Sequence, residues 1–350
     1  MKLLHVIYNG WNENWQLGTL ADNGHDILFE YTPEALRRGL ELSPRHLPLR
    51  ALAFGGFPDH QHRLPGLIAD TLPDSYRTPA GVSPLDHLAL IGEHGRGALS
   101  YAAPGAKPPP PAEQYLQVLL GLDASWLIKL PAPGEHKEVC AIEHVYAQLA
   151  RACGLDMPET RHYDLERRLS AFAVRRYDRR FDNGSGMRLP VHTLAGLLHA
   201  DFHLPATDYS IFLRATRLIT RDERQVEAAF QRCVFNVLFN NRADHARSFA
   251  YRMARNGDWQ LAPCYDLGFH AGEHQMPVMG ERLAPALTDL LRLAADAALP
   301  ERRARDMIAA MTAQAGLFAK LARTAPIRAV TVRAIARSVS ANRQRLLGRA

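Results

Sequence analysis

One stretch of the sequence decides how this chain is expected to fold: Phe235-Asn-Val-Leu-Phe-Asn-Asn-Arg-Ala-Asp-His-Ala-Arg-Ser-Phe-Ala-Tyr251. Its apolar start predicts the end of a helix, and a polar loop follows at 240–248. A strand is expected next, and Asn256-Gly257 then predicts a hairpin turn, because both residues tolerate positive φ. The second strand is expected to run into Tyr265-Asp266-Leu267. The stretch therefore predicts a polar loop and an aspartate at the two ends of one hairpin.

Composition sets the broad class of the protein. The 350 residues are 47% hydrophobic, which is typical of a globular protein with two or three packed units. No apolar run approaches the length of about 18 residues that a membrane span needs, and Asn9-Gly10 interrupts the N-terminus too early for a signal peptide. The net charge of +6 is too mild to predict nucleic-acid binding. Because the four cysteines form no CxxC pair, we expect reduced thiols in a cytoplasmic protein.

Strand patterns dominate the first part of the chain and helix patterns the second. Residues 3–8, 15–21 and 25–31 carry β-branched and aromatic residues between turns, and Thr32-Pro33 opens a short helix. Consecutive prolines at 107–111 mark a boundary. Two further strands are expected at 125–130 and 172–178, and helices at 139–153, 208–219, 222–241, 284–296 and 301–321, with a last one ending at 348. This order predicts an α+β fold with a cleft between two lobes.

Several short motifs occur in a fixed order along nearly the whole chain: Gly66-Leu-Ile-Ala-Asp-Thr-Leu-Pro-Asp74, Leu127-Ile-Lys129, Arg176-Tyr-Asp-Arg179, Phe235-Asn236 with Asn241, Asp244-His245, and Leu261-Ala-Pro with Tyr265-Asp-Leu267. As an ordered set they resemble the HipA-like toxin-kinase family. The resemblance implies a two-lobed, protein-kinase-like fold of three parts. These are a β-rich N-terminal subdomain at 1–105, an N-lobe at 106–180 and a mainly helical C-lobe at 181–350.

The resemblance also implies an activity and partners. Members of the family are serine/threonine kinases of toxin–antitoxin modules that phosphorylate translation components such as aminoacyl-tRNA synthetases. A small helix-turn-helix antitoxin restrains them and binds operator DNA, so DNA is contacted indirectly. The expected partner of this chain is therefore such an antitoxin or a translation factor. We expect no contact with a membrane.

Four positions are expected to bind ATP. Lys129 lies in an apolar strand, where an ammonium group is costly without an anionic partner. We expect that partner on the following helix, at Glu143 in preference to Glu138. The resemblance implies that Lys129 contacts the phosphates and that Arg175 and Tyr177 lie beside the adenine. The alternative for Lys129 is a solvent-facing strand residue.

The polar loop and the hairpin aspartate correspond to the family's catalytic groups. The resemblance makes Asp266 a Mg²⁺ ligand, with a helix-capping aspartate as the alternative. The family's loop reads Asp-Asp-His or Asp-Gly-His, any residue, then Lys-Asn, with the first Asp as base and the Asn as metal ligand. Here Ala243 stands in the place of the base and Ser248 in the place of the asparagine, while His245 is retained. Losing a general base typically costs about 10²- to 10⁴-fold in rate.

A third departure lies before the lysine strand. The family has a Gly-Ser-rich phosphate loop there, whereas Gly121 is the only glycine between Pro111 and Trp126. Together the departures predict a pseudokinase or a strongly impaired kinase that acts by binding a protein and ATP. Two alternatives stay open: an active kinase that uses Asp244 as a substitute base, and an active kinase in which Ala243 is an introduced substitution.

Two other kinds of site are not favoured. The segment His199-Ala-Asp-Phe-His203 has metal-ligand residue types, but a closed zinc site normally needs four ligands. A Ser-His-Asp triad is discounted because the sequence contains no Gly-x-Ser-x-Gly elbow.

Overall fold

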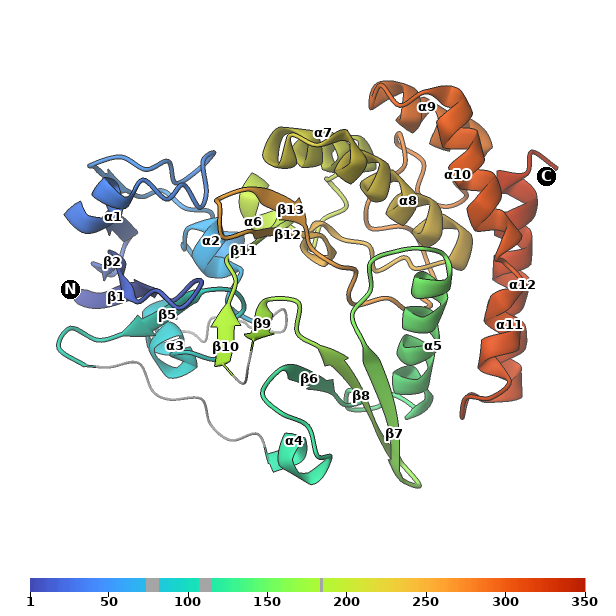
Figure 1. Ribbon diagram of the computed structural model, residues 1–350, viewed down its shortest axis with the longest axis horizontal. Coiled ribbons are helices and arrows are strands. Elements are labelled where there is room, and N and C mark those ends of the chain that lie inside the picture. The colour runs from blue at the N-terminus through green and yellow to red at the C-terminus, as the bar shows by residue number, and fades with distance from the viewer. Residues whose placement is uncertain (74–81, 107–114, 183–184, 350) are drawn as a thin grey trace. The chain divides into compact units, whose positions relative to one another are not determined.

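The computed structural model describes residues 1–73, 82–106, 115–182 and 185–349 (Figure 1). The proline-rich boundary expected at 107–111 lies outside the described residues. The chain forms two compact units that alternate along the sequence. The first contains Met1–Val118, Asp178–Asp201 and Ala250–Gln260, and the second contains Leu119–Tyr177, Phe202–Phe249 and Leu261–Ala350. This division differs from three consecutive domains, since two short segments from the second half of the chain join the first unit.

The first unit is built on a five-stranded sheet with strand order β4-β3-β2-β1-β5. Its strands are β1 (Lys2–Tyr8), β2 (Trp15–Asp22), β3 (Ile27–Tyr31), β4 (Ala53–Phe54) and β5 (Leu99–Ala102). The first three are antiparallel neighbours and confirm the strands expected from the sequence. In β3 buried and exposed residues alternate strictly, which is the pattern of a strand with one face on the core.

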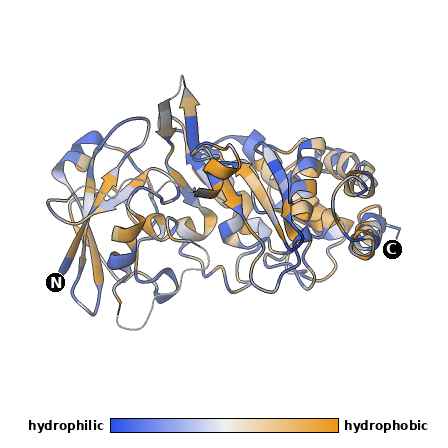
Figure 2. Ribbon diagram, turned by 90° about the horizontal axis from the view of Figure 1, so that it is seen from below, coloured by the Kyte–Doolittle hydropathy of each residue, from blue (hydrophilic) through white to orange (hydrophobic). Residues whose placement is uncertain are grey.

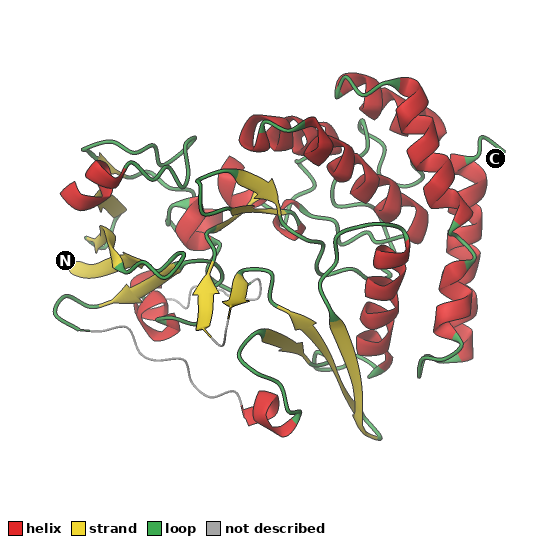
Figure 3. Cartoon of the chain, in the orientation of Figure 1, coloured by secondary structure: helices red, strands yellow, loops and turns green. Residues whose placement is uncertain are grey.

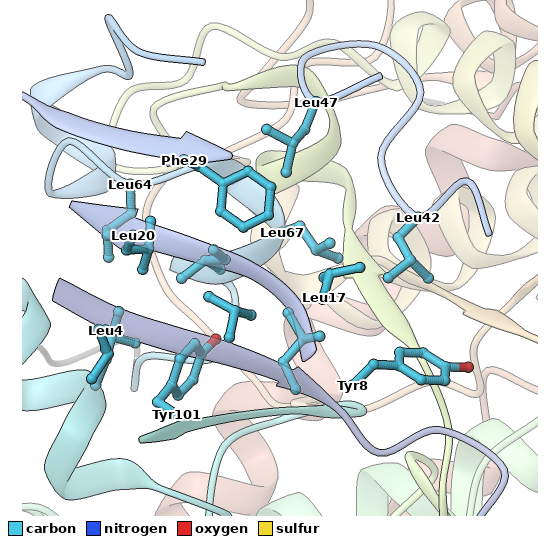
Figure 4. Close-up of a cluster of buried hydrophobic side chains, with 14 of the residues drawn as sticks. Leu4, Tyr8, Leu17, Leu20, Phe29, Leu42, Leu47, Leu64, Leu67 and Tyr101 are labelled. Carbon is cyan, nitrogen blue, oxygen red and sulfur yellow. The ribbon is translucent and has the colours of Figure 1, made fainter. Parts of the chain in front are cut away.

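Short helices surround this sheet: α1 (Pro33–Arg38), α2 (Gly66–Ala69), α3 (Pro84–Ile91) and α6 (Leu194–Leu198). The predicted start of α1 is confirmed, because the Thr32 hydroxyl accepts a hydrogen bond from the Ala35 amide and Pro33 follows it. The core between sheet and helices is apolar, and Figure 4 shows side chains from several strands and loops converging in it. Its members include Leu4, Leu17, Leu20, Phe29, Leu67 and Tyr101.

The hairpin predicted around Asn256-Gly257 is present as β12 (Ala250–Met253) and β13 (Trp259–Leu261), beside β11 (Val191–Thr193). The Ala254 amide donates to the Asp258 carbonyl, and Gly257 takes a φ of 87°. The second strand is shorter than expected, since it ends at Leu261 and an irregular segment leads to Asp266. A second hairpin, β9 (Arg179–Asp182) and β10 (Ser185–Arg188), precedes β11.

The second unit combines a small sheet with many helices (Figure 3). Its sheet has the order β6-β8-β7, with β6 (Trp126–Lys129), β8 (Leu169–Arg175) and β7 (Thr160–Glu166), and α5 (Glu138–Ala152) packs against it. A short helix, α4 (Tyr115–Leu119), precedes β6. Figure 2 shows hydrophobic and hydrophilic residues on the same C-terminal helices, as expected for amphipathic helices. These helices are α7 (Tyr209–Thr220), α8 (Glu223–Phe239), α9 (Leu287–Asp296), α10 (Glu301–Ala313), α11 (Leu317–Ala322) and α12 (Ala329–Leu346).

The helix expected at 301–321 is divided in two. The α10 helix ends at Ala313, and α11 begins after Gly316, a residue with poor helix propensity. All four cysteines are free thiols. No helix in the described part of the chain combines the length and apolar character that crossing a membrane requires.

Candidate active site

A lysine held between two carboxylates is the centre of the candidate site, which lies within the second unit. Lys129 ends strand β6, and its Nζ lies 2.6 Å from Glu143 Oε1 and 2.5 Å from Asp266 Oδ1. Glu143 projects from α5 about one and a half turns after the helix begins, so the predicted pairing of Lys129 with Glu143 is confirmed. Glu138 instead accepts hydrogen bonds from Arg328 at the start of α12.

This contact sets the ionisation of all three side chains. Burial alone would lower the pKa of Lys129, but the charges of Glu143 and Asp266 raise it above its usual range. Burial raises the pKa of Glu143 to about 7, although Lys129 opposes this shift. The Lys129 ammonium is the main reason that the pKa of Asp266 lies below its usual value. At neutral pH the site therefore holds a cationic lysine, an ionised aspartate and a glutamate close to its titration point.

Asp266 takes an unusual backbone conformation, with a φ of 58° in the left-handed region. Such a conformation costs free energy in a residue other than glycine, and it persists where the surroundings fix it. Here the irregular segment after β13 turns the carboxylate toward Lys129. Among the described residues no group of three or more His, Cys, Asp or Glu side chains is arranged to hold a metal. Mg²⁺ tolerates such a sparse protein shell, because it keeps several waters and binds substrate phosphates.

The loop after α8 carries the residues that depart from the family's pattern. Ala243 offers only a methyl group at the position expected for a base. The Ser248 hydroxyl donates to the Ala243 carbonyl at 3.1 Å and lies 3.0 Å from His245 Nδ1. Ser248 and His245 therefore brace the loop internally, and the serine oxygen is already engaged in two hydrogen bonds.

Asp244, the carboxylate next to Ala243, is completely buried. Its Oδ2 lies 2.7 Å from the Tyr209 hydroxyl and 2.7 Å from His274 Nδ1, and its Oδ1 accepts the Gln275 amide at 2.9 Å. Three donors on one inaccessible carboxylate are typical of a structural group. This geometry disfavours Asp244 as a base for a substrate hydroxyl.

Sequence reasoning missed the partners of Asp244, because they come from distant elements. Tyr209 begins α7, and its hydroxyl also accepts a hydrogen bond from Asn236 of α8 at 2.8 Å. Asn236 in turn accepts from Asn241, whose side-chain oxygen accepts the Gly268 amide. This network joins the loop to the segment that carries Asp266. The only sequence signal for it was the presence of Asn236 and Asn241 among the family motifs.

The two residues expected beside an adenine make other contacts. The Arg175 guanidinium lies 5.4 Å from the centre of the Trp126 ring and donates to the Ser125 hydroxyl. The Tyr177 ring stacks on Tyr265 at 5.1 Å, and Tyr265 is the neighbour of Asp266 in the chain. Tyr177 thus contacts Tyr265, the residue before Asp266, whereas Arg175 packs against Trp126 of the sheet.

Residues 112–114 of the segment expected to lack a phosphate loop lie outside the described residues. Its described remainder forms α4 and a turn in which the Ser125 amide donates to Asp123. Gly121 takes a positive φ of 63°. This part shows a helix and a capped turn in place of a glycine-rich loop.

A Ser-His-Asp hydrogen-bond chain does occur, in the first unit. The Ser43 hydroxyl lies 3.0 Å from His192 Nε2, and His192 Nδ1 lies 2.7 Å from Asp70 Oδ2. All three residues are at least 96% buried. Asp70 also accepts two hydrogen bonds from Thr193. Because the serine is not accessible, this chain is a buried polar link between a loop, α2 and β11, and it is not a hydrolase site.

The mixed sheets and helices, with the lysine strand, its paired helix and the hairpin aspartate, define a kinase-like α+β fold. The HipA N-terminal domain family matches residues 8–102, and the HipA-like C-terminal domain family matches residues 106–317. The chain therefore belongs to the HipA-like family, as its motifs predicted.

Two solved structures are similar to this chain. The structure of the Shewanella oneidensis MR-1 toxin–antitoxin system HipA, in a complex with HipB and its operator DNA, superposes with a TM-score of 0.76 at 16% identity. That match covers 99% of this chain and 97% of the other. The Helicobacter pylori proinflammatory kinase CtkA gives a TM-score of 0.45 at 13% identity, over 64% of this chain and 88% of its own. A search of curated protein sequences finds no match.

Proposed function

We propose that this protein is a pseudokinase of the HipA-like family, which binds ATP with Mg²⁺ in its second unit and acts by binding a protein partner. The proposal has two parts, retained nucleotide binding and lost phosphoryl transfer. They rest on different residues, so they are tested separately.

The case for nucleotide binding rests on the charges around Lys129. Its ammonium group is kept charged by Glu143 and Asp266, and a charged lysine is the group that contacts phosphates in kinase folds. Asp266 is ionised at neutral pH, so it is suited to hold Mg²⁺. Bound Mg²⁺ would neutralise phosphate charge. Asp266 would hold the metal in place of its contact with Lys129, and Lys129 would then be available to bind phosphate oxygens.

The case against phosphoryl transfer rests on one observation. Asp244, the carboxylate next to the position of the lost base, is buried and its oxygens already accept hydrogen bonds. Transfer to a hydroxyl needs a group that orients the hydroxyl and accepts its proton. Ala243 has no such group, and Asp244 is fully buried and already accepts hydrogen bonds from Tyr209, His274 and Gln275. Replacement of the second metal ligand by Ser248, whose hydroxyl braces the loop, weakens the site further.

The fold also supports a protein partner. The HipA structure with the same fold was determined with HipB and operator DNA. We propose an antitoxin of the helix-turn-helix class as the partner of this chain, with DNA contacted through that antitoxin. Such a protein would regulate by occupying its partner, with no chemical step required.

The test of lost transfer is ATP turnover by the wild-type protein and by Ala243→Asp. We expect turnover at background for the wild type and a gain of about 10²- to 10⁴-fold for Ala243→Asp, the usual contribution of a general base. Asp244→Asn is the companion variant and should leave turnover at background. Substantial wild-type turnover that Asp244→Asn abolishes would overturn the proposal and make Asp244 the base.

A further inference from the structure

The end of α8, directly before the loop at 240–248, is capped by side chains from two other helices of the second unit. The last carbonyl groups of a helix have no partner inside it and need donors from elsewhere. The carbonyls of Val237 and Leu238 accept from Asn342 Nδ2 of α12 at 2.9 and 3.1 Å. The carbonyl of Phe239 accepts from the Tyr146 hydroxyl of α5 at 2.6 Å. Both α12, which packs against α8 (Figure 1), and α5 therefore fix the point at which the loop begins.

The neighbours of Asn342 set the orientation of its side-chain amide. Its Oδ1 accepts a hydrogen bond from the Arg345 guanidinium, about one turn further along α12. Its Nδ2 therefore faces the end of α8, where it also lies 3.3 Å from Asn240 Oδ1. Asn342 is 3% exposed, so its polar atoms depend on these protein partners in place of water. Both ends of the amide are thus in use, and its side chain has a defined direction.

Asn240 carries this contact on to the segment that contains Asp266. It ends α8 in the left-handed conformation, with a φ of 56°, and is buried. While its Oδ1 accepts from Asn342, its Nδ2 donates to the His270 carbonyl at 2.8 Å. Its own carbonyl accepts the His270 amide at 3.1 Å. Asn240 therefore holds both polar backbone groups of a residue that lies four positions after Asp266.

These contacts form one continuous path from α12 to the residue expected to hold Mg²⁺. The path ends in the short irregular segment in which Asp266 takes its φ of 58°. A left-handed conformation in an aspartate persists where the surrounding contacts hold it. The affinity of a metal ligand also depends on the groups that orient it. Without Asn342, the side chain of Asn240 would lose the donor that fixes it, and residues 266–270 would be held less firmly.

We propose that Asn342 is a positioning residue of the nucleotide site. It acts through Asn240 and His270 and holds the Asp266 carboxylate in the place where it binds Mg²⁺ with ATP. This role rests on the nucleotide binding proposed above, and it makes that site dependent on the C-terminal helix. Asn342 itself contacts neither the nucleotide nor the metal.

The first test is calorimetric titration of the full chain with ATP, with and without Mg²⁺. Asn342→Leu keeps a side chain of similar size but has no donor. We expect it to reduce the gain in ATP affinity that Mg²⁺ gives by about 10-fold, the lower end of the effect of groups that orient a metal ligand. Affinity for metal-free ATP should be unchanged, because Lys129 keeps its contact with Glu143. Asn342→Gln keeps the amide and should recover part of the gain. An undiminished gain in Asn342→Leu would overturn the proposal.

Two further variants separate positioning from the stability of α12. Val339→Ala is the matched control, since it removes a buried apolar side chain from the same helix about one turn earlier. It should lower the free energy of unfolding but leave the gain from Mg²⁺ unchanged. Equal losses of the gain in Val339→Ala and Asn342→Leu would show that Asn342 acts only through the stability of the helix, and would overturn the proposal.

Asn240→Gly tests the path itself. Glycine keeps the left-handed conformation at the end of α8 but removes the amide that lies between Asn342 and His270. We expect the same loss of the gain from Mg²⁺ as in Asn342→Leu, and no further loss when the two substitutions are combined. Additive losses would contradict a path through Asn240.

Hydrogen exchange of the His270 amide, measured by NMR without nucleotide, distinguishes this role from the proposed function. In Asn342→Leu we expect this amide to exchange about 10-fold faster than in the wild type, with no comparable change in α10. Val339→Ala should not accelerate His270 relative to α10. Absence of ATP binding in the wild type would contradict the proposed function and, with it, the role of Asn342 toward Mg²⁺. An unchanged exchange rate at His270 beside normal ATP binding would overturn the role of Asn342 alone.

Discussion

At the scale of single residues, Glu143 is the group that makes the site sensitive to pH. Its side chain is mostly buried on α5, and within the described part of the chain it accepts one hydrogen bond, from Lys129. Burial outweighs the attraction of Lys129 and places its pKa near 7. Asp266, by contrast, is ionised well below neutral pH, and Lys129 stays charged well above it. Of these three side chains, Glu143 is the one that titrates in the neutral range.

This titration predicts a pH-dependent stability. The folded protein holds the Glu143 proton more tightly than the unfolded chain, where the pKa is 4.5. The resulting stabilisation is complete below the unfolded value and is lost as the pH rises through about 7. Glu143→Gln stays neutral, so its free energy of unfolding should fall less than that of the wild type between about pH 5 and about pH 8. Denaturant unfolding at both pH values measures this, and parallel pH profiles would contradict it.

A second residue-scale prediction concerns Asp244. Asp244→Ala removes the acceptor of Tyr209, His274 and Gln275, and we expect it to lower the free energy of unfolding by about 2–4 kcal/mol. Asp258→Ala, on the exposed hairpin turn, is the control and should change it by about 0.5 kcal/mol or less. Equally small changes in the free energy of unfolding of both variants, measured by urea denaturation, would show that the hydrogen bonds of Asp244 do not stabilise the fold.

At the scale of elements, α5 connects two parts of the second unit through two glutamates with different tasks. Glu143 faces β6 and holds Lys129, whereas Glu138 faces the start of α12. Glu138 accepts hydrogen bonds from the Arg328 amide and guanidinium and from the Thr331 hydroxyl. It thereby caps α12 from outside, since that helix has no side-chain cap of its own.

This division of tasks gives a prediction with opposite outcomes for the two positions. Glu138→Ala should lower the free energy of unfolding by about 1–3 kcal/mol, because it leaves the donors at the start of α12 unpaired, and it should leave ATP affinity unchanged. Glu143→Ala should weaken ATP binding, because Lys129 loses the group that positions it. Urea denaturation and ATP titration of both variants test this. If ATP bound more weakly to Glu138→Ala but not to Glu143→Ala, Glu143 would not be the residue that positions Lys129 for ATP.

Local patterns predicted these elements well and their long-range contacts poorly. The pairing of Lys129 with Glu143 was predictable because strand and helix are consecutive and Glu143 lies further from the start of the helix than Glu138. The burial of Asp244 was not, since Tyr209 and His274 lie 35 and 30 residues away and carry no local signal. For the same reason, the contact of Glu138 with Arg328, 190 residues away, could not be read from the sequence.

At the scale of the whole molecule, the two units are interleaved in sequence. Motif order suggested consecutive domains, but 178–201 and 250–260 complete the first unit. Asp70 shows why: its carboxylate accepts hydrogen bonds from His192 and Thr193, which the sequence places more than 100 residues later. Composition shifts cannot reveal such a connection.

Because the first unit also needs residues 178–201 and 250–260, we predict that the N-terminal segment does not fold alone. A fragment of residues 1–118 lacks His192 and Thr193, which donate hydrogen bonds to the buried carboxylate of Asp70, and it also lacks β11 and α6 of the same unit. We expect a fragment without cooperative thermal unfolding, in contrast to the full chain, measured by circular dichroism. Cooperative unfolding of the fragment would show that the first unit is autonomous.

The central claim is that this HipA-like chain retains a nucleotide site centred on Lys129 and Asp266. Calorimetric titration with ATP, with and without Mg²⁺, tests it most directly. We predict binding that strengthens with Mg²⁺ and disappears in Asp266→Ala. No binding at millimolar ATP, or binding indifferent to both Mg²⁺ and Asp266→Ala, would contradict the account.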